Sequence, residues 1–454
     1  MLTPSLMNIG HVHSAVVASD AAGWALPSFQ TQACEVGSEA QRSRGSTAGF
    51  ASGLFRTPLA AASAAAAVAN VAAQRGRLAG GRRLSGSARV RHLDGPSRST
   101  TALAATKQLH SSVPLLSTGT LEVSDGWELY YEEHGSAAGI PVVFLHGGPG
   151  AGCSRRMAQL FDPAGYRVVL FDQRGCGKSR RPGDAAAQLE ANTTWHLVED
   201  IEALRKHLGI DQWVVAGGSW GTTLALAYAS RHQDHILGMV LRAACLFRDE
   251  EFDFFLGPGH GARTAAPLAW SKLTSWLSPA EVRSAHEIAL AFREAALGQD
   301  AKMKPQDAVQ RWVSWEMTLM SAKPPTPNEG SGKGASVDPS AGAASRRREP
   351  PTTPWAGLHA SQALLTMHYV VERGFFPANF ALLEEARNFG FPLRIVHGRK
   401  DCVCPMKNAK DLAAAAPDAD LLLTDGGHSQ WDSANIDAFV SATDELCAQL
   451  CQPA

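Results

Sequence analysis

A serine enclosed by glycines is the residue of this chain best placed to do chemistry. Residues 217–221 read Gly-Gly-Ser-Trp-Gly and fit the pattern G-x-S-x-G, with Ser219 at the centre. An apolar run at 213–216 precedes the pattern and an Ala- and Leu-rich run at 222–228 follows it, which indicates a strand, a tight turn and a helix. In that context the glycines permit a strained turn that lifts the hydroxyl above the edge of a sheet. We predict that Ser219 is a nucleophile; the alternative is a chance Gly-Ser turn.

A serine hydroxyl also needs a base and a group that orients the base. Two later apolar runs, at 393–398 and 421–424, indicate buried parallel strands, and Asp401 and His428 follow them closely. The order serine, aspartate, histidine is that of alpha/beta-hydrolases, and loops at the carboxyl ends of parallel strands lie at one edge of the sheet. We therefore predict His428 as the general base and Asp401 as its orienting acid. The alternatives are a helix N-cap for Asp401 and a surface turn for His428.

Glycines after an earlier strand can supply anion-binding N–H groups. Residues 141–145 indicate a buried strand, and His-Gly-Gly-Pro-Gly follows at 146–150. We predict an oxyanion hole formed by the N–H of Gly148, or of Gly147, together with the N–H of Trp220. A glycine-rich turn can also bind phosphate, but this one lacks the G-K-[ST] continuation of a phosphate loop.

The motifs at 146–150 and 217–221, with Asp-Gln-Arg-Gly-Cys-Gly-Lys-Ser at 172–179, resemble those of the proline iminopeptidase (prolyl aminopeptidase) family. Residues 399–405 and 426–429 resemble its later signatures, and the likeness covers about 113–452 with an interruption in the middle. It implies an alpha/beta-hydrolase fold with a helical cap. It also implies a serine aminopeptidase that releases N-terminal proline from peptides through an acyl-enzyme, with no cofactor and no metal.

The resemblance further implies acidic cap residues beside the substrate's secondary ammonium group. Residues 311–318 resemble the W-E-x-x-T segment of the family, which makes Glu316 the first carboxylate; the alternative is an exposed helix glutamate. A buried carboxylate attracts an ammonium group more strongly than a surface one, because desolvation strengthens the attraction. The second family carboxylate lies in A-R-I-E-N-H-Y-F, where this chain has Thr366. That departure either weakens amine binding or leaves another acid to substitute.

The proline pocket of the family is also partly altered. Arg242 is kept, Cys245 replaces an aromatic residue, Phe255 falls near a family tyrosine, and Cys404 matches a pocket cysteine. The resemblance assigns these residues to substrate binding, and an apolar lining suits a pyrrolidine ring. The alternative is ordinary core packing.

Alternating strands and helices predict a mostly parallel α/β sheet flanked by helices. We place the hydrolase core at 113–245 and 386–452 and an inserted helical cap at 246–385, with a disordered loop at about 321–354. Residues 118–133 indicate an antiparallel pair of strands that turns at Ser-Asp-Gly.

Two polar residues of the 172–179 motif have a separate interpretation. Asp172 and Arg174 either shape the floor of the site or form a salt bridge that fixes the turn at Gly175. We favour the structural role, because acyl transfer needs neither side chain.

The first 108 residues differ in composition from the rest. They are rich in Ala, Ser, Gly and Arg and poor in acids, which is typical of a mitochondrial or plastid transit peptide; the alternative is a disordered tail. The 454-residue chain has a net charge of −1, which gives no electrostatic case for nucleic-acid or membrane binding. It contains no apolar run of membrane-spanning length. Its eight scattered cysteines favour free thiols in a reducing compartment, and nothing in the sequence indicates an oligomeric state.

Three functional hypotheses follow. The first is the prolyl aminopeptidase, in which Ser219, His428 and Asp401 cleave the peptide. The second is a general esterase or amidase on the same three residues, which applies if Thr366 has abolished amine recognition. The third is a weakly catalytic binding protein for a small ligand, although binding alone does not need such a triad.

Overall fold

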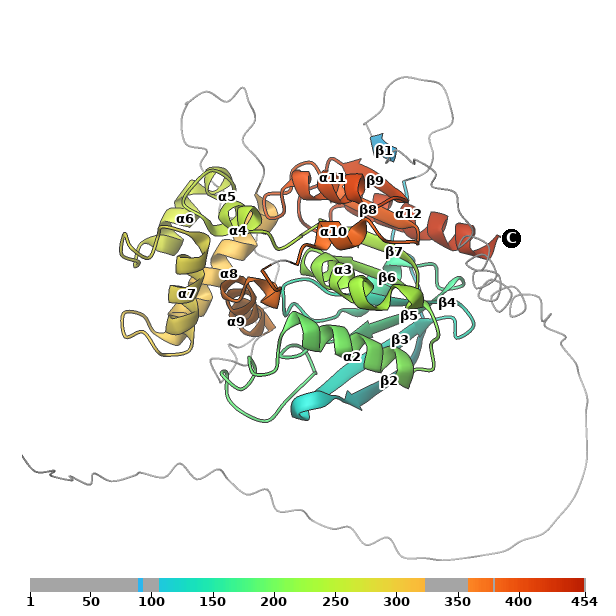
Figure 1. Ribbon diagram of the computed structural model, residues 1–454, viewed down its shortest axis with the longest axis horizontal. Helices are drawn as coiled ribbons and strands as arrows, with labels where there is room; N and C mark the ends of the chain where they lie inside the picture. Colours follow the sequence, from blue (N-terminus) through green and yellow to red (C-terminus); the bar gives the residue numbers. More distant parts are fainter. Residues whose placement is uncertain (1–88, 93–105, 323–357, 379, 453–454) are drawn as a thin grey trace, which may run out of the picture. The chain divides into compact units, whose positions relative to one another are not determined.

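The computed structural model describes residues 89–92, 106–322, 358–378 and 380–452. Within these residues, nine strands form a single sheet in the order β1-β9-β8-β7-β6-β4-β5-β3-β2 (Figure 1). Neighbouring strands are parallel except in the β2–β3 and β3–β5 pairs. The predicted fold class is therefore confirmed. The strands are Arg89–His92 (β1), Leu115–Glu122 (β2), Glu128–Gly135 (β3), Ile140–Leu145 (β4), Tyr166–Phe171 (β5), Trp213–Gly218 (β6), Ile236–Arg242 (β7), Leu393–Gly398 (β8) and Ala419–Thr424 (β9).

The burial of the strands follows their place in the sheet. Every residue of β6 and β7 is buried, because helices cover both faces of the sheet. The sequences of such strands are nearly continuous apolar runs. β2 lies at an edge and is largely exposed. It pairs with β3 across the turn at Ser124–Gly126, so the predicted antiparallel pair and its turn are confirmed.

Helices cover the two faces of the sheet in separate groups. Apolar side chains of α2 (Thr194–His207), α3 (Trp220–His232) and α11 (Met406–Ala415) form one core with the sheet. The long helix α12 (Ser433–Cys451) and the short η2 (Arg155–Leu160) form the other. Because both faces of the sheet are packed against helices, the loops at the strand ends start from well-defined positions.

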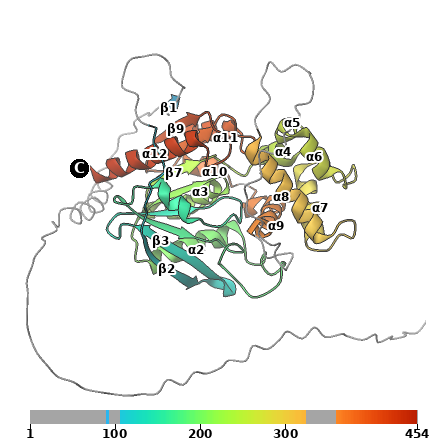
Figure 2. The same cartoon turned by 180° about the vertical axis from the view of Figure 1, so that it is seen from behind.

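The cap lies between β7 and β8 in the sequence. Its helices gather to one side of the sheet in both views (Figures 1 and 2). On α8, buried residues recur every three or four positions, which gives the helix one apolar face and makes it amphipathic. That face joins the separate apolar core of the cap. The cap helices are α4 (Asp249–Leu256), α5 (Ala262–Ala265), α6 (Pro267–Thr274), α7 (Ala285–Ala296), α8 (Pro305–Ser321) and α9 (Leu358–Val371).

Two boundaries differ from the predicted domains. The predicted cap ran to residue 385, but α10 (Leu382–Ala386) packs against α3 and α11 of the core. An amphipathic run shows that a helix buries one face and does not show which body it packs on. The predicted N-terminal segment also contains β1, which pairs in parallel with β9. With two arginines and a histidine in four residues, β1 lacks the apolar alternation that marks a strand, and it covers an edge that would otherwise be unpaired.

Several predictions concern residues outside the described part of the chain. Residues 1–88 and 93–105, most of the proposed transit segment, are among them, as is nearly all of the predicted loop at 321–354. Among the described helices, none combines the length and apolar character needed to cross a membrane. The seven described cysteines form no disulfide with one another.

Candidate active site

Ser219 lies in the sharp turn between β6 and α3. Its backbone has φ 57° and ψ −125°, a conformation that costs an L-residue energy and is characteristic of a strained functional turn. The turn is held because Ser219 N donates a 2.9 Å hydrogen bond to the carbonyl of Arg242. A Cβ at Gly221 would collide with the carbonyl oxygen of Leu145, so only glycine lets the helix start this close to β4. The sequence pattern therefore produces the predicted elbow.

The side chains of Ser219, His428 and Asp401 form one hydrogen-bonded chain. His428 Nε2 is 3.2 Å from Ser219 Oγ, and His428 Nδ1 is 2.8 Å from Asp401 Oδ2. Three different loops bring them together, after β6, β8 and β9, all at the carboxyl ends of parallel strands. This geometry is the one that a nucleophile, a base able to take its proton, and an acid that orients the base require.

Asp401 is fixed and kept ionised by its surroundings. Its Oδ1 accepts 2.8 Å hydrogen bonds from the N–H groups of Val403 and Cys404. Burial alone would raise the pKa of this carboxyl, but the charge and hydrogen bond of His428 outweigh burial, and the pKa lies below its ordinary value. The alternative N-cap role is wrong, because α11 begins at Met406 with Pro405 at its cap.

Two further buried side chains, Arg242 and His397, hold the loops that carry Asp401 and His428. The Arg242 guanidinium donates to the carbonyl oxygen of His428 and so ties the end of β7 to the histidine loop. His397 accepts a hydrogen bond from Ala244 N at Nδ1 and donates from Nε2 to the Cys404 carbonyl. Burial lowers the pKa of His397, which favours this neutral form. Arg242 also lines the cavity, so its predicted place beside substrate is compatible with this second role.

Backbone N–H groups suited to an oxyanion lie beside Ser219. Gly147 is the nearer of the two predicted glycines: a Cβ placed on it would lie 3.3 Å from Ser219 Cβ and 3.9 Å from Ser219 Oγ. Gly148 has φ 114°, which suits glycine alone. Trp220 is the first residue of α3, so its N–H lacks an acceptor within the helix. Gly147, Gly148 and Trp220 all line the cavity above Ser219.

Gln173 links the two halves of this predicted oxyanion hole. Its side-chain amide donates to the His146 carbonyl at 3.1 Å and accepts from Trp220 Nε1 at 3.0 Å. Its backbone N–H donates to His146 Nε2 at 3.1 Å, which leaves the proton of that ring on Nδ1, facing the Gly147 carbonyl. The residue is buried, and sequence reasoning missed it because the motif at 172–179 shows no partner for it.

The Gln173→Glu variant is expected to lower kcat about 100-fold with a small change in KM, because misplacing a catalytic group by about 1 Å has an effect of this size. A carboxylate there still accepts from Trp220 but repels the His146 carbonyl, so only one half of the hole is displaced. The measurement is the affinity for a boronic acid analogue of proline, which mimics the tetrahedral intermediate, compared with the affinity for proline itself. A parallel loss of both affinities would show a merely structural role.

Asp172 and Arg174 are structural, but they do not pair with each other as predicted. Arg174 forms a two-pronged ion pair with Asp200 at 2.7 Å for both contacts. Asp172 instead accepts hydrogen bonds from the N–H groups of Cys153 and Lys178. The prediction named the right role and the wrong partner, because the partner of Arg174 lies on α2, 26 residues away.

One group of possible metal ligands occurs among the described residues, formed by His146, Asp172 and Cys176. All three are buried, but their atoms already have partners. His146 Nε2 accepts from Gln173 N, and the two Asp172 oxygens accept from Cys153 N and Lys178 N. These hydrogen bonds hold the turn at 172–179 in place, so the grouping of the three side chains has a structural explanation.

A cavity of about 300 Å³ opens above Ser219, between the sheet edge and the cap. Almost every residue predicted for the site lines it, and only Asp401 stands behind, covered by His428. The predicted residues on its wall are Gly147, Gly148, Ser219, Trp220, Arg242, Cys245, Phe255, Glu316, Thr366, Cys404 and His428. The structure therefore brings into one place residues that lie more than 280 positions apart in the sequence.

Glu316 projects into this cavity from α8. Its carboxylate accepts hydrogen bonds from Trp312 Nε1 at 2.9 Å and from Gln362 Nε2 at 3.1 Å. It keeps some accessible surface because it lines the cavity, but protein surrounds it, and this desolvation raises its pKa to about 7. The alternative of an exposed helix glutamate is wrong. Trp312 and Gln362 were not predicted, although Trp312 precedes Glu316 by one helical turn.

Comparison with known proteins places the chain in a family. A sequence model of the alpha/beta hydrolase fold matches residues 140–278. A protein of Leptolyngbya boryana named probable proline iminopeptidase is 37% identical over 345 residues, which cover 76% of this chain and 98% of that protein. The proline iminopeptidase of Xylella fastidiosa strain Temecula1 is 40% identical over 342 residues (75% and 99%), and that of Arabidopsis thaliana is 39% identical over 325 residues (71% and 78%). The chain belongs to the proline iminopeptidase family.

The departure of this chain from the family motif lies next to Glu316. Thr366, one turn after Gln362 on α9, donates from Oγ1 to the Gln362 carbonyl at 2.9 Å and also lies within hydrogen-bonding reach of Glu316. Glu251 lines the same cavity, but its carboxylate already accepts from Leu246 N and Arg248 Nε. Glu251 is therefore already paired with a cation, whereas the hydrogen-bond partners of Glu316 are neutral donors, so Glu316 is the carboxylate on this wall that remains available to a cationic ligand.

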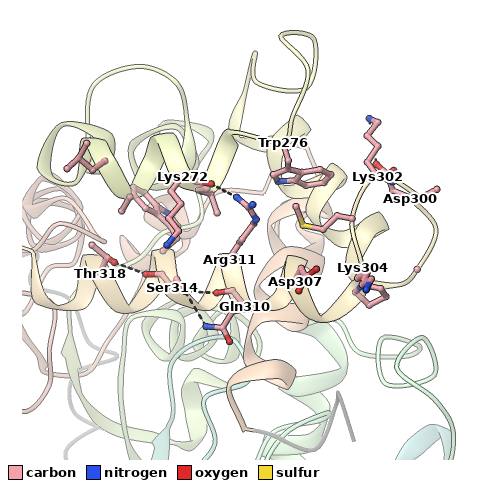
Figure 3. A pocket seen from close by; sticks show the side chains of 18 residues that line it. Lys272, Trp276, Asp300, Lys302, Lys304, Asp307, Gln310, Arg311, Ser314 and Thr318 are labelled. Carbon is pink, nitrogen blue, oxygen red and sulfur yellow. Dashed lines mark hydrogen bonds and ion pairs between the residues drawn. The ribbon is translucent and has the colours of Figure 1, made fainter. Parts of the chain in front are cut away.

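A larger cavity of about 1180 Å³ lies against a different face of α8 (Figure 3). It is lined by α6, by the loop at 298–305 and by the α8 side chains Gln310, Arg311, Ser314 and Thr318. Figure 3 shows Arg311 reaching across to the Lys272 carbonyl. None of the three residues of the hydrogen-bonded chain lines this cavity, so size alone does not identify the site.

Proposed function

We propose that this chain is a serine aminopeptidase that releases N-terminal proline from peptides. The observation that carries the proposal is that Ser219 and His428, hydrogen-bonded in a row with Asp401, line the same cavity as Glu316. The relatives named proline iminopeptidase support it, because they match this chain over nearly their whole length or, in the Arabidopsis thaliana protein, over 78% of it.

The acylation step uses the three residues in named roles. Ser219 Oγ attacks the carbonyl carbon of the N-terminal residue while His428 Nε2 takes its proton, and Asp401 stabilises the resulting imidazolium. The N–H groups of Gly147 or Gly148 and of Trp220 stabilise the oxyanion. When the tetrahedral intermediate collapses, the scissile C–N bond breaks and His428 gives its proton to the leaving amine. A water molecule, activated by His428, then hydrolyses the prolyl ester and frees Ser219.

The acyl side of the cavity selects a free secondary amine. Ionised Glu316 pairs with the ammonium group in a desolvated wall, where a charge-assisted hydrogen bond is stronger than at the surface. The hydroxyl of Thr366 can accept a second ammonium N–H, because its own proton is donated to Gln362. Phe255, Cys245 and Cys404 line the same cavity, and we assign them to the pyrrolidine ring.

Three substrates test the proposal: a chromogenic prolyl anilide, its N-acetylprolyl counterpart and a simple acetyl ester. We expect turnover of the free-amine substrate only, and its loss in Ser219→Ala. Ester turnover without a preference for the free amine would favour a general esterase or amidase. No Ser219-dependent turnover of any of the three would favour the binding-protein hypothesis.

We also propose that residues 1–108 carry an address for a plastid or mitochondrion, on their composition alone. Fusing this segment to a fluorescent protein and imaging it in plant cells tests the proposal. Diffuse fluorescence outside both organelles would contradict it.

A further inference from the structure

His428 determines which side of the cavity the leaving group occupies. The acyl group lies between Ser219 and the amine-binding residues of α8 and α9. The leaving amine must lie at His428, because the general acid has to be within hydrogen-bonding distance of the atom it protonates. The peptide beyond the scissile bond therefore runs along the residues that follow His428. Of these, Gln430 and Trp431 line the cavity.

This side of the cavity carries donors that lack acceptors. Gln430 Nε2 is buried and has no hydrogen-bond partner among the described residues. The guanidinium carbon of Arg156 lies 4.1 Å from the centre of the Trp431 ring. Within the described part of the chain, Arg156 has no carboxylate partner, whereas the preceding Arg155 pairs with Glu132 at 2.9 Å. Trp431, on the cavity wall, thus contacts a guanidinium that has no carboxylate partner among the described residues, and the adjacent Gln430 has an amide donor without an acceptor among them.

The contact with Trp431 leaves the N–H groups of Arg156 available to a ligand. The ring interacts with the positive charge of the guanidinium over its face and accepts no conventional hydrogen bond, so the five N–H donors can still bind a carboxylate. The ring also limits the positions of a long side chain that would otherwise be mobile, so less entropy is lost when a ligand binds. Arg156 does not itself line the cavity, but its contact with Trp431, which does, holds it next to the cavity wall.

We propose that Arg156, Trp431 and Gln430 form a subsite for the terminal carboxylate of a short peptide, so that the preferred substrates are peptides of two or three residues. The inference rests on the proposed aminopeptidase function. An extended residue spans about 3.3–3.6 Å, so one or two residues beyond the scissile bond bring the carboxylate within reach of a long arginine side chain. In a longer peptide the carboxylate passes beyond the subsite. The chemistry recognised is a carboxylate, and an acidic side chain on the leaving residue is its other source.

The test compares Pro-Ala, Pro-Ala-amide and Pro-Glu-amide in the full chain and in the Arg156→Gln variant. We expect kcat/KM for Pro-Ala to exceed that for its amide by about tenfold, as one charge-assisted hydrogen-bonded pair provides, and this ratio to fall close to one in the variant. The matched control is Arg155→Gln, which changes the neighbouring exposed arginine and should keep the wild-type ratio. The ratio should also fall as ionic strength rises, because salt screens the pair.

Other outcomes would overturn the inference. An equal loss on Pro-Ala and its amide in Arg156→Gln would show that Arg156 acts only on structure. A Pro-Glu-amide rate equal to that of Pro-Ala would move the preference to acidic side chains. Hydrolysis of the prolyl anilide without any preference for Pro-Ala over its amide would refute the subsite and leave the aminopeptidase intact. Absence of anilide hydrolysis would instead count against the proposed function itself.

Discussion

The Ser219→Ala variant is expected to lower kcat for a prolyl anilide by about 10⁶-fold, the effect of removing the nucleophile of a serine triad in another hydrolase. The reason is geometric. Among Ser219, His428 and Asp401, Ser219 Oγ is the atom that we propose forms the acyl bond, and His428 Nε2 lies 3.2 Å from it. The cavity and Glu316 are untouched by the change, so substrate binding should persist.

The measurement separates chemistry from binding. Initial rates at saturating substrate give kcat. The affinity of the variant for proline, measured by direct binding, shows whether the cavity is intact. Ser314→Ala, an exposed serine on a different face of α8, is the matched control and should retain wild-type rates. Residual activity of more than about one per cent in Ser219→Ala would place the nucleophile elsewhere, since removal of one triad member leaves only a small background.

Replacing Glu316 by glutamine is expected to lower kcat/KM for a prolyl substrate by about 100-fold or more, the usual effect of removing one partner of a desolvated charge pair. The amide keeps the shape of the side chain and can still bond to Trp312 or Gln362. It cannot neutralise the ammonium group, and no second free acid on the cavity wall replaces it. Glu294→Gln, an exposed glutamate of α7, is the matched control and should have no effect.

The pH profile should identify the same group. Because burial raises the pKa of Glu316 to about 7, the carboxyl is neutral below this pH and cannot pair with an ammonium group. The kcat/KM of the prolyl substrate should therefore rise as pH increases through about 7, since this ratio reports ionisation of the free enzyme. In Glu316→Gln this component should disappear, and only the ionisations shared with other substrates should remain. A profile of identical shape in the variant would contradict the assignment.

The residues of the triad could be predicted because their positions follow from chain direction. Ser219, Asp401 and His428 each follow a buried strand, and parallel strands end at one edge, so spacing along the sequence becomes proximity in space. Glu316 could be found because a family motif marks it. The partners of these residues could not be predicted. Gln173 bridges two loops, and such a contact depends on the twist and register of strands that no local pattern encodes.

The same limit explains the errors. The sequence predicts a salt bridge of Arg174 with Asp172, its neighbour in the motif. Arg174 instead pairs with Asp200 of α2, a helix that packs on the sheet. α10 was assigned to the cap because its amphipathic pattern fits either body. Trp431 and Arg156 lie 275 positions apart, and only the folded chain shows that they stack.

Because the cap is inserted between β7 and β8, the residues of the site come from two parts of the fold, the sheet-based core and the helical cap. The residues that we propose to break the bond come from the sheet edge, and Glu316 and Thr366, which we propose to hold the amine, come from α8 and α9. Substitutions in these helices can therefore change the choice of substrate while the machinery for cleavage stays in place. The threonine at position 366 is one such change, and this chain carries it together with the hydrogen-bonded Ser219, His428 and Asp401.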